Sequence, residues 1–407
     1  MNIIKFALLG TAAIAAVSVS AQASTASDIA ELKAQINALT AQVAANQAQT
    51  AVPAGFQLVT IGTQAATVVP GLVNTKYDGK TATVMSIMPT ADAPASTTVE
   101  WSGLVRAAVI YDQDDANFAT WDIVSRARLK FVGKTDTAIG EVGVRVAFLT
   151  DSVGIGGLNR GNTSLSTDGY WGWWKMTPEL TLGAGVDGSL AGIGYGYDGL
   201  CTCNYTDFAP AGYGHQGDPS QMRLSYESGP IKAAIAVEDY TNTPASNNFG
   251  VAGEIKYAGD AISGEISGGY WSPDVAGANA SWLVGIGAGF ALGDVGKISA
   301  SAGIGHDDDA SSSFDWNDAD YWKANILASV NLSDQAHAEI GFNHMHISAN
   351  VVTGTVDQSI DSVLAGIYYE PVKQLTIGLE GEWLQESAEP GAPGQHTRAD
   401  LVTVFRF

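Results

Sequence analysis

The sequence predicts an all-β protein, a 16-stranded antiparallel transmembrane β-barrel preceded by a short helix. Two observations predict the barrel. Apolar and polar residues alternate at every second position from about residue 97 to the last residue, and the connections between these segments are short and long in turn. This combination of alternating strands, short turns on one side and long loops on the other is typical of outer-membrane barrels.

Residues 1–23 have the three parts of a secretory signal peptide. Lys5 supplies positive charge, residues 6–19 are apolar, and Ala21-Gln22-Ala23 forms a small-x-small cleavage pattern. The apolar run is too short for a permanent membrane helix, although an uncleaved anchor is the alternative. We therefore expect export and a mature chain that begins near residue 24.

The charge of the chain argues against two classes of partner. The full chain has a net charge of −22, and removal of residues 1–23 takes away one Lys and no acid, which leaves −23. Binding to nucleic acid requires clustered cations. Docking on an anionic lipid surface requires them as well. We expect neither kind of binding.

Residues 99–112 show the alternation clearly. Val99, Trp101 and Tyr111 share one face, whereas Arg106 and Asp112 lie on the other. At about 3.3 Å per residue and a tilt near 40°, the step from Trp101 to Tyr111 projects to roughly 25 Å along the membrane normal. This distance matches the apolar band of an outer-membrane barrel, with an aromatic residue at each edge.

Residues 275–293 contain no charged side chain and meet the length criterion for a membrane helix. The large apolar residues from Trp282 to Leu292 nevertheless recur at every second position, with glycines between several of them. Period two places them on one face of a strand, and the glycines would weaken a helix. We predict a strand here.

The same pattern continues to the end of the chain and predicts an even number of strands, as both termini on one side require. The sixteen predicted strands are 97–112, 121–133, 140–151, 168–177, 179–187, 220–228, 230–239, 248–258, 261–271, 280–292, 295–305, 320–332, 335–346, 359–369, 373–384 and 397–407. The short turns are predicted at 133–136, 177–179, 228–230, 332–334 and 370–373, and the long loops at 152–167, 188–219, 306–319 and 385–396. A soluble sandwich or propeller would need a second apolar face. That face instead carries charges such as Arg126, Arg128 and Lys130.

Residues 24–96 precede the predicted barrel. Residues 24–50 carry a heptad seam that predicts a periplasmic coiled-coil helix, namely Ile29, Leu32, Ile36, Leu39 and Val43. Ile at a with Leu at d favours a dimer, and a lone amphipathic helix packed on the barrel is the alternative. Residues 51–96 contain short β-like runs, which leave a linker, a small β subdomain and a partial plug of the lumen all open.

No catalytic or cofactor motif is present in the sequence, and we expect no enzymatic activity. A nucleophile elbow, a His-Glu-x-x-His helix and a phosphate loop are all missing. His344-Met345-His346 and the acidic run 307–309 offer metal-ligand types. Both are more typical of a strand end and a solvated loop, so we predict no metal site.

At this point the sequence resembles the general porins of Gram-negative bacteria, and most of all those of alphaproteobacteria. The resemblance covers residues 97–407. It rests on the signal peptide, the strand at 125–131, the aromatic strand at 170–174 before the turn at 177–178, and the alternating C-terminal residues 401–407. It implies a homotrimer in the outer membrane among lipids and lipopolysaccharide. The terminal Phe407 resembles the signal that the barrel-assembly machinery reads.

The resemblance also implies that residues 188–219, the third connection on the long-loop side when 113–120 is counted as the first, fold into the barrel and form a constriction. Asp187 at its start, with Asp198 and Asp207 inside it, would then face basic residues of the early strands. Those residues are Arg106, Arg126, Arg128, Lys130 and Arg145. Opposed charges would create a transverse field across a narrow aqueous gap. Charges that merely solvate the lumen wall are the alternative.

Cys201 and Cys203 lie inside that loop. An even number of cysteines in an oxidising compartment suggests pairing, and the Cys-x-Cys spacing does not suit the Cys-x-x-Cys metal and redox motifs. We predict a local, strained disulfide that stiffens the loop.

The sequence therefore predicts a water-filled channel for small hydrophilic solutes and ions, without a cofactor. The net charge favours modest cation selectivity, which the basic row could reverse locally. One alternative is a channel specific for a solute such as a sugar, which could stack on the aromatic residues Trp171, Trp173, Tyr195, Tyr197 and Tyr205. Another is a structural tether from the outer membrane to the cell wall, suggested by the coiled coil.

Overall fold

The computed structural model describes residues 59–70, 81–87, 97–114, 119–151, 165–192, 218–239, 249–272, 280–307, 319–351, 354–389 and 394–407. The chain divides into two units, residues 1–58 and 59–407, and all the described residues belong to the second unit. The predicted signal peptide and coiled-coil seam, Asp198, Asp207 and the two cysteines lie outside the described residues.

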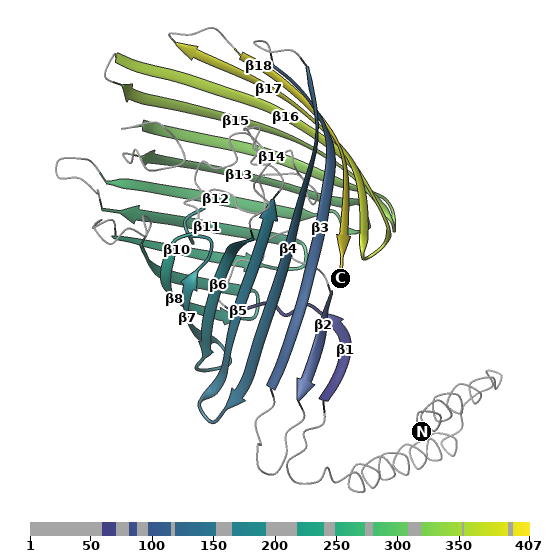
Figure 1. The fold of residues 1–407 in the computed structure, drawn as a ribbon. Coiled ribbons are helices and arrows are strands. Elements are labelled where there is room, and N and C mark those ends of the chain that lie inside the picture. Colours follow the sequence, from purple (N-terminus) through teal and green to yellow (C-terminus); the bar gives the residue numbers. More distant parts are fainter. Residues whose placement is uncertain are drawn as a thin grey trace, which may run out of the picture. The chain divides into compact units, whose positions relative to one another are not determined.

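Sixteen antiparallel strands, β3 to β18, form one closed barrel (Figure 1). Each strand pairs with its neighbours in the chain, and pairing of β18 with β3 closes the ring. The strands are β3 (Thr97–Asp114), β4 (Thr120–Thr137), β5 (Gly140–Asp151), β6 (Ser166–Lys175), β7 (Leu180–Val186), β8 (Ser220–Ser228), β9 (Ile231–Asp239), β10 (Phe249–Ala258), β11 (Ile262–Trp271), β12 (Ser281–Ala291), β13 (Gly296–Asp307), β14 (Ala319–Ser333), β15 (Ala336–Val351), β16 (Gly354–Val372), β17 (Leu375–Glu389) and β18 (Gly394–Arg406). A single turn of 3₁₀-helix (Gly293–Val295) lies between β12 and β13.

All sixteen predicted barrel strands are confirmed, and the uncharged segment that ends at 293 contains β12 rather than a helix. Among the described residues, no helix has the length and apolar character needed to cross a membrane. The turn predicted at 133–136 is wrong, because β4 continues to Thr137. The chain turns instead just before Gly140, whose φ of 115° suits glycine, and the Thr137 hydroxyl donates to the Gly140 carbonyl at 2.6 Å.

Other predicted turns are shorter than expected because the flanking strands extend into them. Glu370 to Val372 belong to β16, and the register of β16 with β17 shifts between Tyr369 and Val372. Proline is tolerated in a strand at such an irregularity, and Pro371 lies within it. Leu332 and Ser333 likewise belong to β14.

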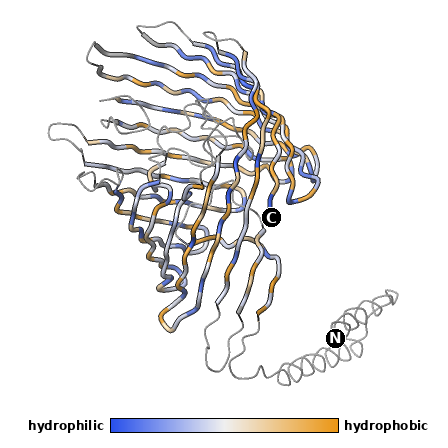
Figure 2. The backbone as a smooth tube through the Cα atoms, in the orientation of Figure 1, coloured by the Kyte–Doolittle hydropathy of each residue, from blue (hydrophilic) through white to orange (hydrophobic). Residues whose placement is uncertain are grey.

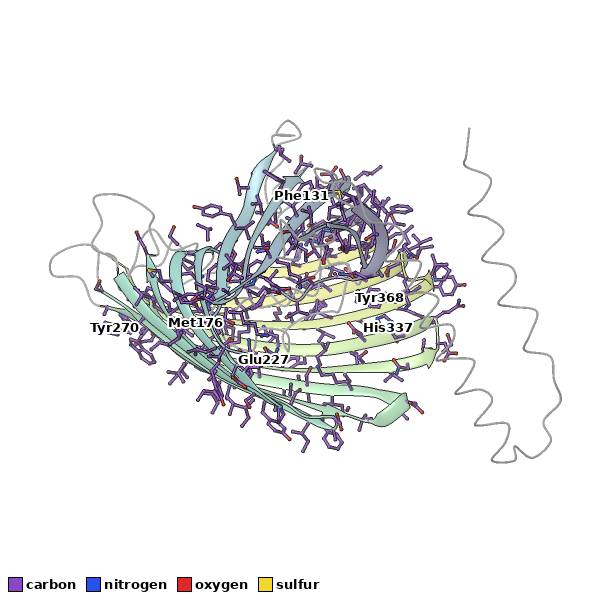
Figure 3. All side chains as sticks on the ribbon, turned by 90° about the horizontal axis from the view of Figure 1, so that it is seen from below. Phe131, Met176, Glu227, Tyr270, His337 and Tyr368 are labelled. Atoms are coloured by element: carbon purple, nitrogen blue, oxygen red, sulfur yellow. The ribbon has the colours of Figure 1, made fainter. Side chains whose placement is uncertain are left out.

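The two faces of the wall differ as the alternation predicts. Along β3, Val105 and Val109 are exposed, whereas Arg106, Ala108 and Ile110 are buried. The hydropathy colours alternate along individual strands in Figure 2. Side chains project from both faces in Figure 3, where the exposed Tyr270 lies on the outside. The outer face is therefore apolar and the inner face carries the charges.

A two-stranded hairpin, β1 (Val59–Ala65) and β2 (Thr81–Ile87), joins the barrel at β3. Strand β2 pairs with Thr97 to Trp101, whereas β18 pairs with the rest of β3 from Leu104 onward. Between them, Phe407 and Gly103 exchange two backbone hydrogen bonds of 3.1 and 3.2 Å. The edge of β3 is thus shared end to end (Figure 1), and part of residues 51–96 is a small β element.

Candidate pore-lining site

Basic side chains gather on the inner face of the first three barrel strands. Arg106 on β3 lies directly opposite Arg126 on β4, and Arg128 and Lys130 follow on the same face of β4. Arg145 on β5 continues the group, and Arg106, Lys130 and Arg145 are buried. The structure therefore brings all five predicted basic residues to one side of the lumen wall.

Asp187 and Asp168, both among the described residues, form ion pairs with this basic wall. Arg145 pairs with Asp187, the residue that follows β7. The sequence predicted Asp187 at the start of the loop, facing the basic residues. Arg128 pairs with Asp168 on β6, which sequence reasoning missed. Simple alternation would place Asp168 beside the outward Tyr170. Gly169, at a φ of 112°, marks a β-bulge where the register of β5 with β6 shifts, and this turns Asp168 inward.

The first residues of the long loop run along the inner wall. The carbonyl of Gly188 accepts a hydrogen bond from Arg223 on β8 at 2.7 Å. The Ser189 hydroxyl and the Leu190 amide donate to the carboxylate of Glu238 on β9, at 2.7 and 3.1 Å. The Ser267 hydroxyl on β11 then donates to the Gly192 carbonyl. Residues 187–192 thus cross the inner faces of β8 to β11.

Arg223 and Glu238 were not predicted as functional residues, although the alternation contains the signal. Arg223 lies between Met222 and Leu224, which are exposed on the outer face, and Glu238 follows the exposed Val237. Both charged side chains are buried. A buried charge requires partners. Their partners here include backbone atoms of a loop, which the periodicity of a strand cannot indicate.

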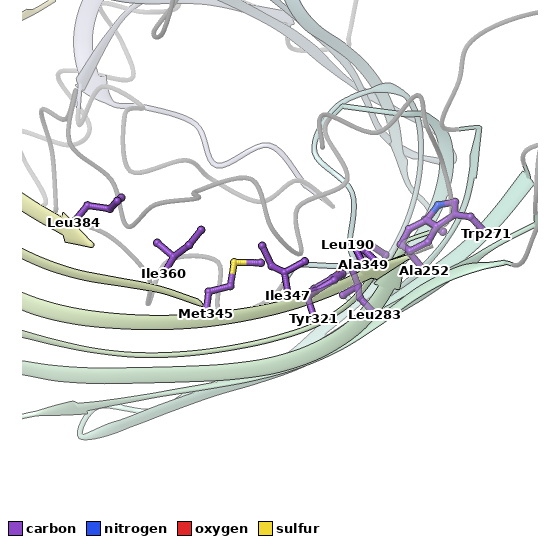
Figure 4. Packing of buried hydrophobic residues seen from close by; sticks show 13 residues of the cluster. Leu190, Ala252, Trp271, Leu283, Tyr321, Met345, Ile347, Ala349, Ile360 and Leu384 are labelled. Carbon is purple, nitrogen blue, oxygen red and sulfur yellow. The ribbon is translucent and has the colours of Figure 1, made fainter. Parts of the chain in front are cut away.

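The inner face also carries an apolar cluster (Figure 4) that begins at the loop. Leu190 and Ala191 are buried in it beside Trp271 and Leu283. The cluster continues along the inner wall through Tyr321, Met345, Ile347, Ile360 and Leu384, and so reaches β17. The wall that the loop contacts is therefore partly apolar. The sequence analysis did not predict this apolar region, because it considered only the charged residues of the inner face.

Buried aromatic rings of the inner face lie over glycines of neighbouring strands. A Cβ added at Gly183 would overlap the Trp171 ring, one at Gly143 would overlap Trp173, and one at Gly250 would overlap Trp271. Trp171 is only 2% exposed. The absence of glycine side chains lets these rings lie against the wall, so Trp171 and Trp173 do not offer a stacking surface to a sugar. Tyr195, Tyr197 and Tyr205 lie outside the described residues.

An acidic patch lies on the other side of β3, across the closing pair of strands. Glu380 on β17 is directly opposite Asp400 on β18, and both are buried on the inner face. Tyr368 donates a hydrogen bond to Glu380 at 2.8 Å. Arg398 pairs with Asp112 at 3.0 Å. The lumen wall therefore carries a buried pair of acids on the β17–β18 side of β3 and the basic residues on the β4–β5 side.

The two histidines considered as metal ligands lie on the outer face. His344 pairs with Asp361 at 2.7 Å and its ring lies 4.7 Å from that of Trp322. His346 contacts the Ser359 hydroxyl at 3.1 Å. Within the described residues, no group of three or more His, Cys, Asp or Glu side chains is arranged to hold a metal ion.

No protein-family model matches the chain, and no curated protein matches it significantly. Solved structures do match. The anion-selective porin from Comamonas acidovorans has a TM-score of 0.59 at 13% identity, over 76% of this chain and 100% of that porin. The outer-membrane channel DcaP of Acinetobacter baumannii has 0.56 at 14%, over 79% and 99%, and OmpT of Vibrio cholerae has 0.55 at 12%, over 76% and 98%. Residues 97–407 thus have the fold of outer-membrane porin barrels.

Proposed function

We propose that the protein is an outer-membrane porin, a water-filled channel for passive diffusion of small hydrophilic solutes and ions. The observation that carries this proposal is a closed barrel whose outer face is apolar while its inner face bears buried charges such as Arg106, Lys130 and Asp400. Only a membrane outside and water inside suit both faces. The fold shared with solved porins and channels supports the same conclusion.

Within the channel, we assign the narrow point to loop 188–219 facing the basic wall. The inward path of residues 187–192 and the Arg145–Asp187 pair support this assignment. Charges on opposite sides of a narrow gap orient dipolar solutes and disfavour apolar ones. Asp198 and Asp207 would add acids to the loop side.

The proposal includes export by the signal peptide, insertion among outer-membrane lipids and lipopolysaccharide, and assembly as a homotrimer of the alphaproteobacterial porin type.

The lengths of the strands support an oligomer. Strand β7 has 7 residues and β16 has 19. At about 3.3 Å per residue and a tilt near 40°, β7 spans roughly 18 Å, less than the apolar band of about 25 Å. A neighbouring protomer would cover this low side better than lipid. A coiled coil of residues 24–50 would then extend towards the cell wall.

The test is conductance in planar bilayers with the purified full chain. We expect stepwise current increases that rise in proportion to salt concentration, with a reversal potential in a salt gradient that gives the sign of selectivity. A folded, heat-modifiable barrel that adds no conductance would refute the proposal. A current blocked saturably by one class of solute would replace the general porin by a substrate-specific channel.

A further inference from the structure

The segment that follows β1 turns into the barrel. Thr67 donates two hydrogen bonds to the side chain of Glu100, from its amide to Oε1 at 2.7 Å and from its hydroxyl to Oε2 at 2.6 Å. Glu100 is buried on the inner face of β3, between the outward Val99 and Trp101. Both oxygens of a buried carboxylate are thus satisfied by one residue of this segment, which fixes Thr67 against the wall.

Two residues further on, the chain reaches the inner faces of β4 and β6. Val69 is 2% exposed and belongs to one buried cluster with Val132, Trp171 and Trp173. Thr67 and Val69 therefore both face the wall. Val68, between them, is 59% exposed. Since its two neighbours are held on the wall, the exposed side chain of Val68 points away from the wall and towards the lumen.

This segment and the long loop occupy the same lateral row of the barrel. Successive cross-strand pairs run from Glu100 to Val132, then to Arg145 and Trp171. Val69, in the segment that follows β1, packs in one cluster with Val132 and Trp171 of this row. Asp187, at the start of the long loop, pairs with Arg145 of the same row.

The Trp171 ring connects the two segments. The guanidinium of Arg223 lies 5.2 Å from the centre of this ring and donates to the carbonyl of Gly188 in the loop. Trp171 also packs in the cluster that contains Val69. Together the two segments contact inner-face residues of β3, β4, β5, β6, β8, β9 and β11.

The inward path is not needed to connect β1 with β2. The register of the hairpin pairs Ala65 with Thr81, so a two-residue turn between them would complete it. Connecting segments normally stay on the surface, because their backbone polar groups need water. Here the chain enters the barrel, and the amide and hydroxyl of Thr67 are met by the Glu100 carboxylate.

We propose that residues 66–70 form a second pore-lining element, a lumen insert at the short-turn side, which narrows the channel and contributes to its size limit and selectivity. This inference rests on the proposed channel function. The lining side chain is Val68, and the anchors are Thr67 on Glu100 and Val69 in the cluster with Trp171.

The test uses a single thiol in the full chain, with Cys201→Ser and Cys203→Ser as the background. In Val68→Cys, a water-soluble thiol reagent with a positive charge is expected to lower single-channel conductance by about 10–30% and to shift selectivity towards anions. A negatively charged reagent should shift selectivity the other way. The matched control is Ile61→Cys on β1, which is 69% exposed and paired outside the barrel ring. It should react without changing the current.

Failure of Val68→Cys to react, or reaction without a change in conductance or selectivity, would overturn the proposal. A second variant separates this result from failure of the channel function itself. Val69→Cys and Val132→Cys, at two positions of one buried cluster, should be joined by a short, reducible bis-thiol-reactive cross-linker, seen as a mobility shift that reductant reverses. A folded protein without that cross-link would show that the segment does not lie on the inner wall, whether or not the barrel conducts.

Discussion

At the scale of single residues, the lumen is a set of charges held in place by short, specific contacts. Arg145 is buried and pairs with Asp187, so each charge compensates the other across the start of the loop. A charge in a partly desolvated lumen is poorly screened by salt. The pair should therefore influence permeating ions more than an exposed pair does.

Removal of either charge of this pair should change ion selectivity with opposite sign. Asp187→Asn leaves the positive charge of Arg145 and should shift the reversal potential in a salt gradient towards anions, by roughly a twofold change in permeability ratio. Arg145→Gln should shift it towards cations, and the double variant should return near the wild type. Glu227→Gln is the control, because its pair with Lys232 at 3.0 Å is exposed. Shifts of the same sign in both single variants would contradict this account.

At the scale of elements, the barrel closes where three segments meet on one edge of β3. Strand β18 ends at Arg406, Phe407 completes the ladder with Gly103, and β2 begins its pairing at Trp101. The terminal aromatic residue predicted as an assembly signal is therefore also the last residue of the closing ladder.

Deletion of Phe407 should lower the stability of the closed barrel. It removes two backbone hydrogen bonds, each worth about 0.5–1.5 kcal/mol, and the ring that covers Gly103. The readout is the temperature at which the folded band disappears in a heat-modifiability gel. Phe405→Ala is the matched control, since Phe405 is exposed to a similar extent on the outer face and its backbone pairing is retained. Equal midpoints for the deletion and the control would show that Phe407 does not close the barrel.

The elements also show how far the sequence could be read. Because each strand faces lipid on one side and water on the other, apolar and polar residues alternate at every second position. All sixteen strands could therefore be predicted. The signal disappears where β15 to β17 pass beyond the apolar band, because the outer positions there are polar, as Ser348, Asp357 and Ser387 show. These strands were therefore predicted too short. The bulge at Gly169 reverses the alternation locally, so the inward position of Asp168 could not be predicted. The contacts of Thr67 and Ser189 join segments that are distant in the sequence, and no local pattern indicates them.

At the scale of the whole molecule, the proposed function requires that the barrel wall separates lipid on its outer face from water on its inner face. The outer residues of β12 are Trp282, Val284, Ile286 and Phe290, all exposed, and the residues between them are buried on the inner face. Burial of the outer apolar residues would stabilise a soluble protein by about 25 cal/mol per Å². Their exposure all along the strand of a closed ring is the arrangement expected where the barrel is surrounded by an apolar phase.

The most direct measurement scans β12 with spin labels in lipid bilayers. Cysteines are introduced one at a time from Ser281 to Ala291 in the Cys201→Ser, Cys203→Ser background, and collision rates are measured with oxygen, which partitions into lipid, and with a water-soluble nickel complex. The account predicts that contact with oxygen is greatest at 282, 284, 286, 288 and 290 and low at the positions between them. Equal accessibility along the strand, or stronger contact with the nickel complex at those even-numbered positions, would contradict it.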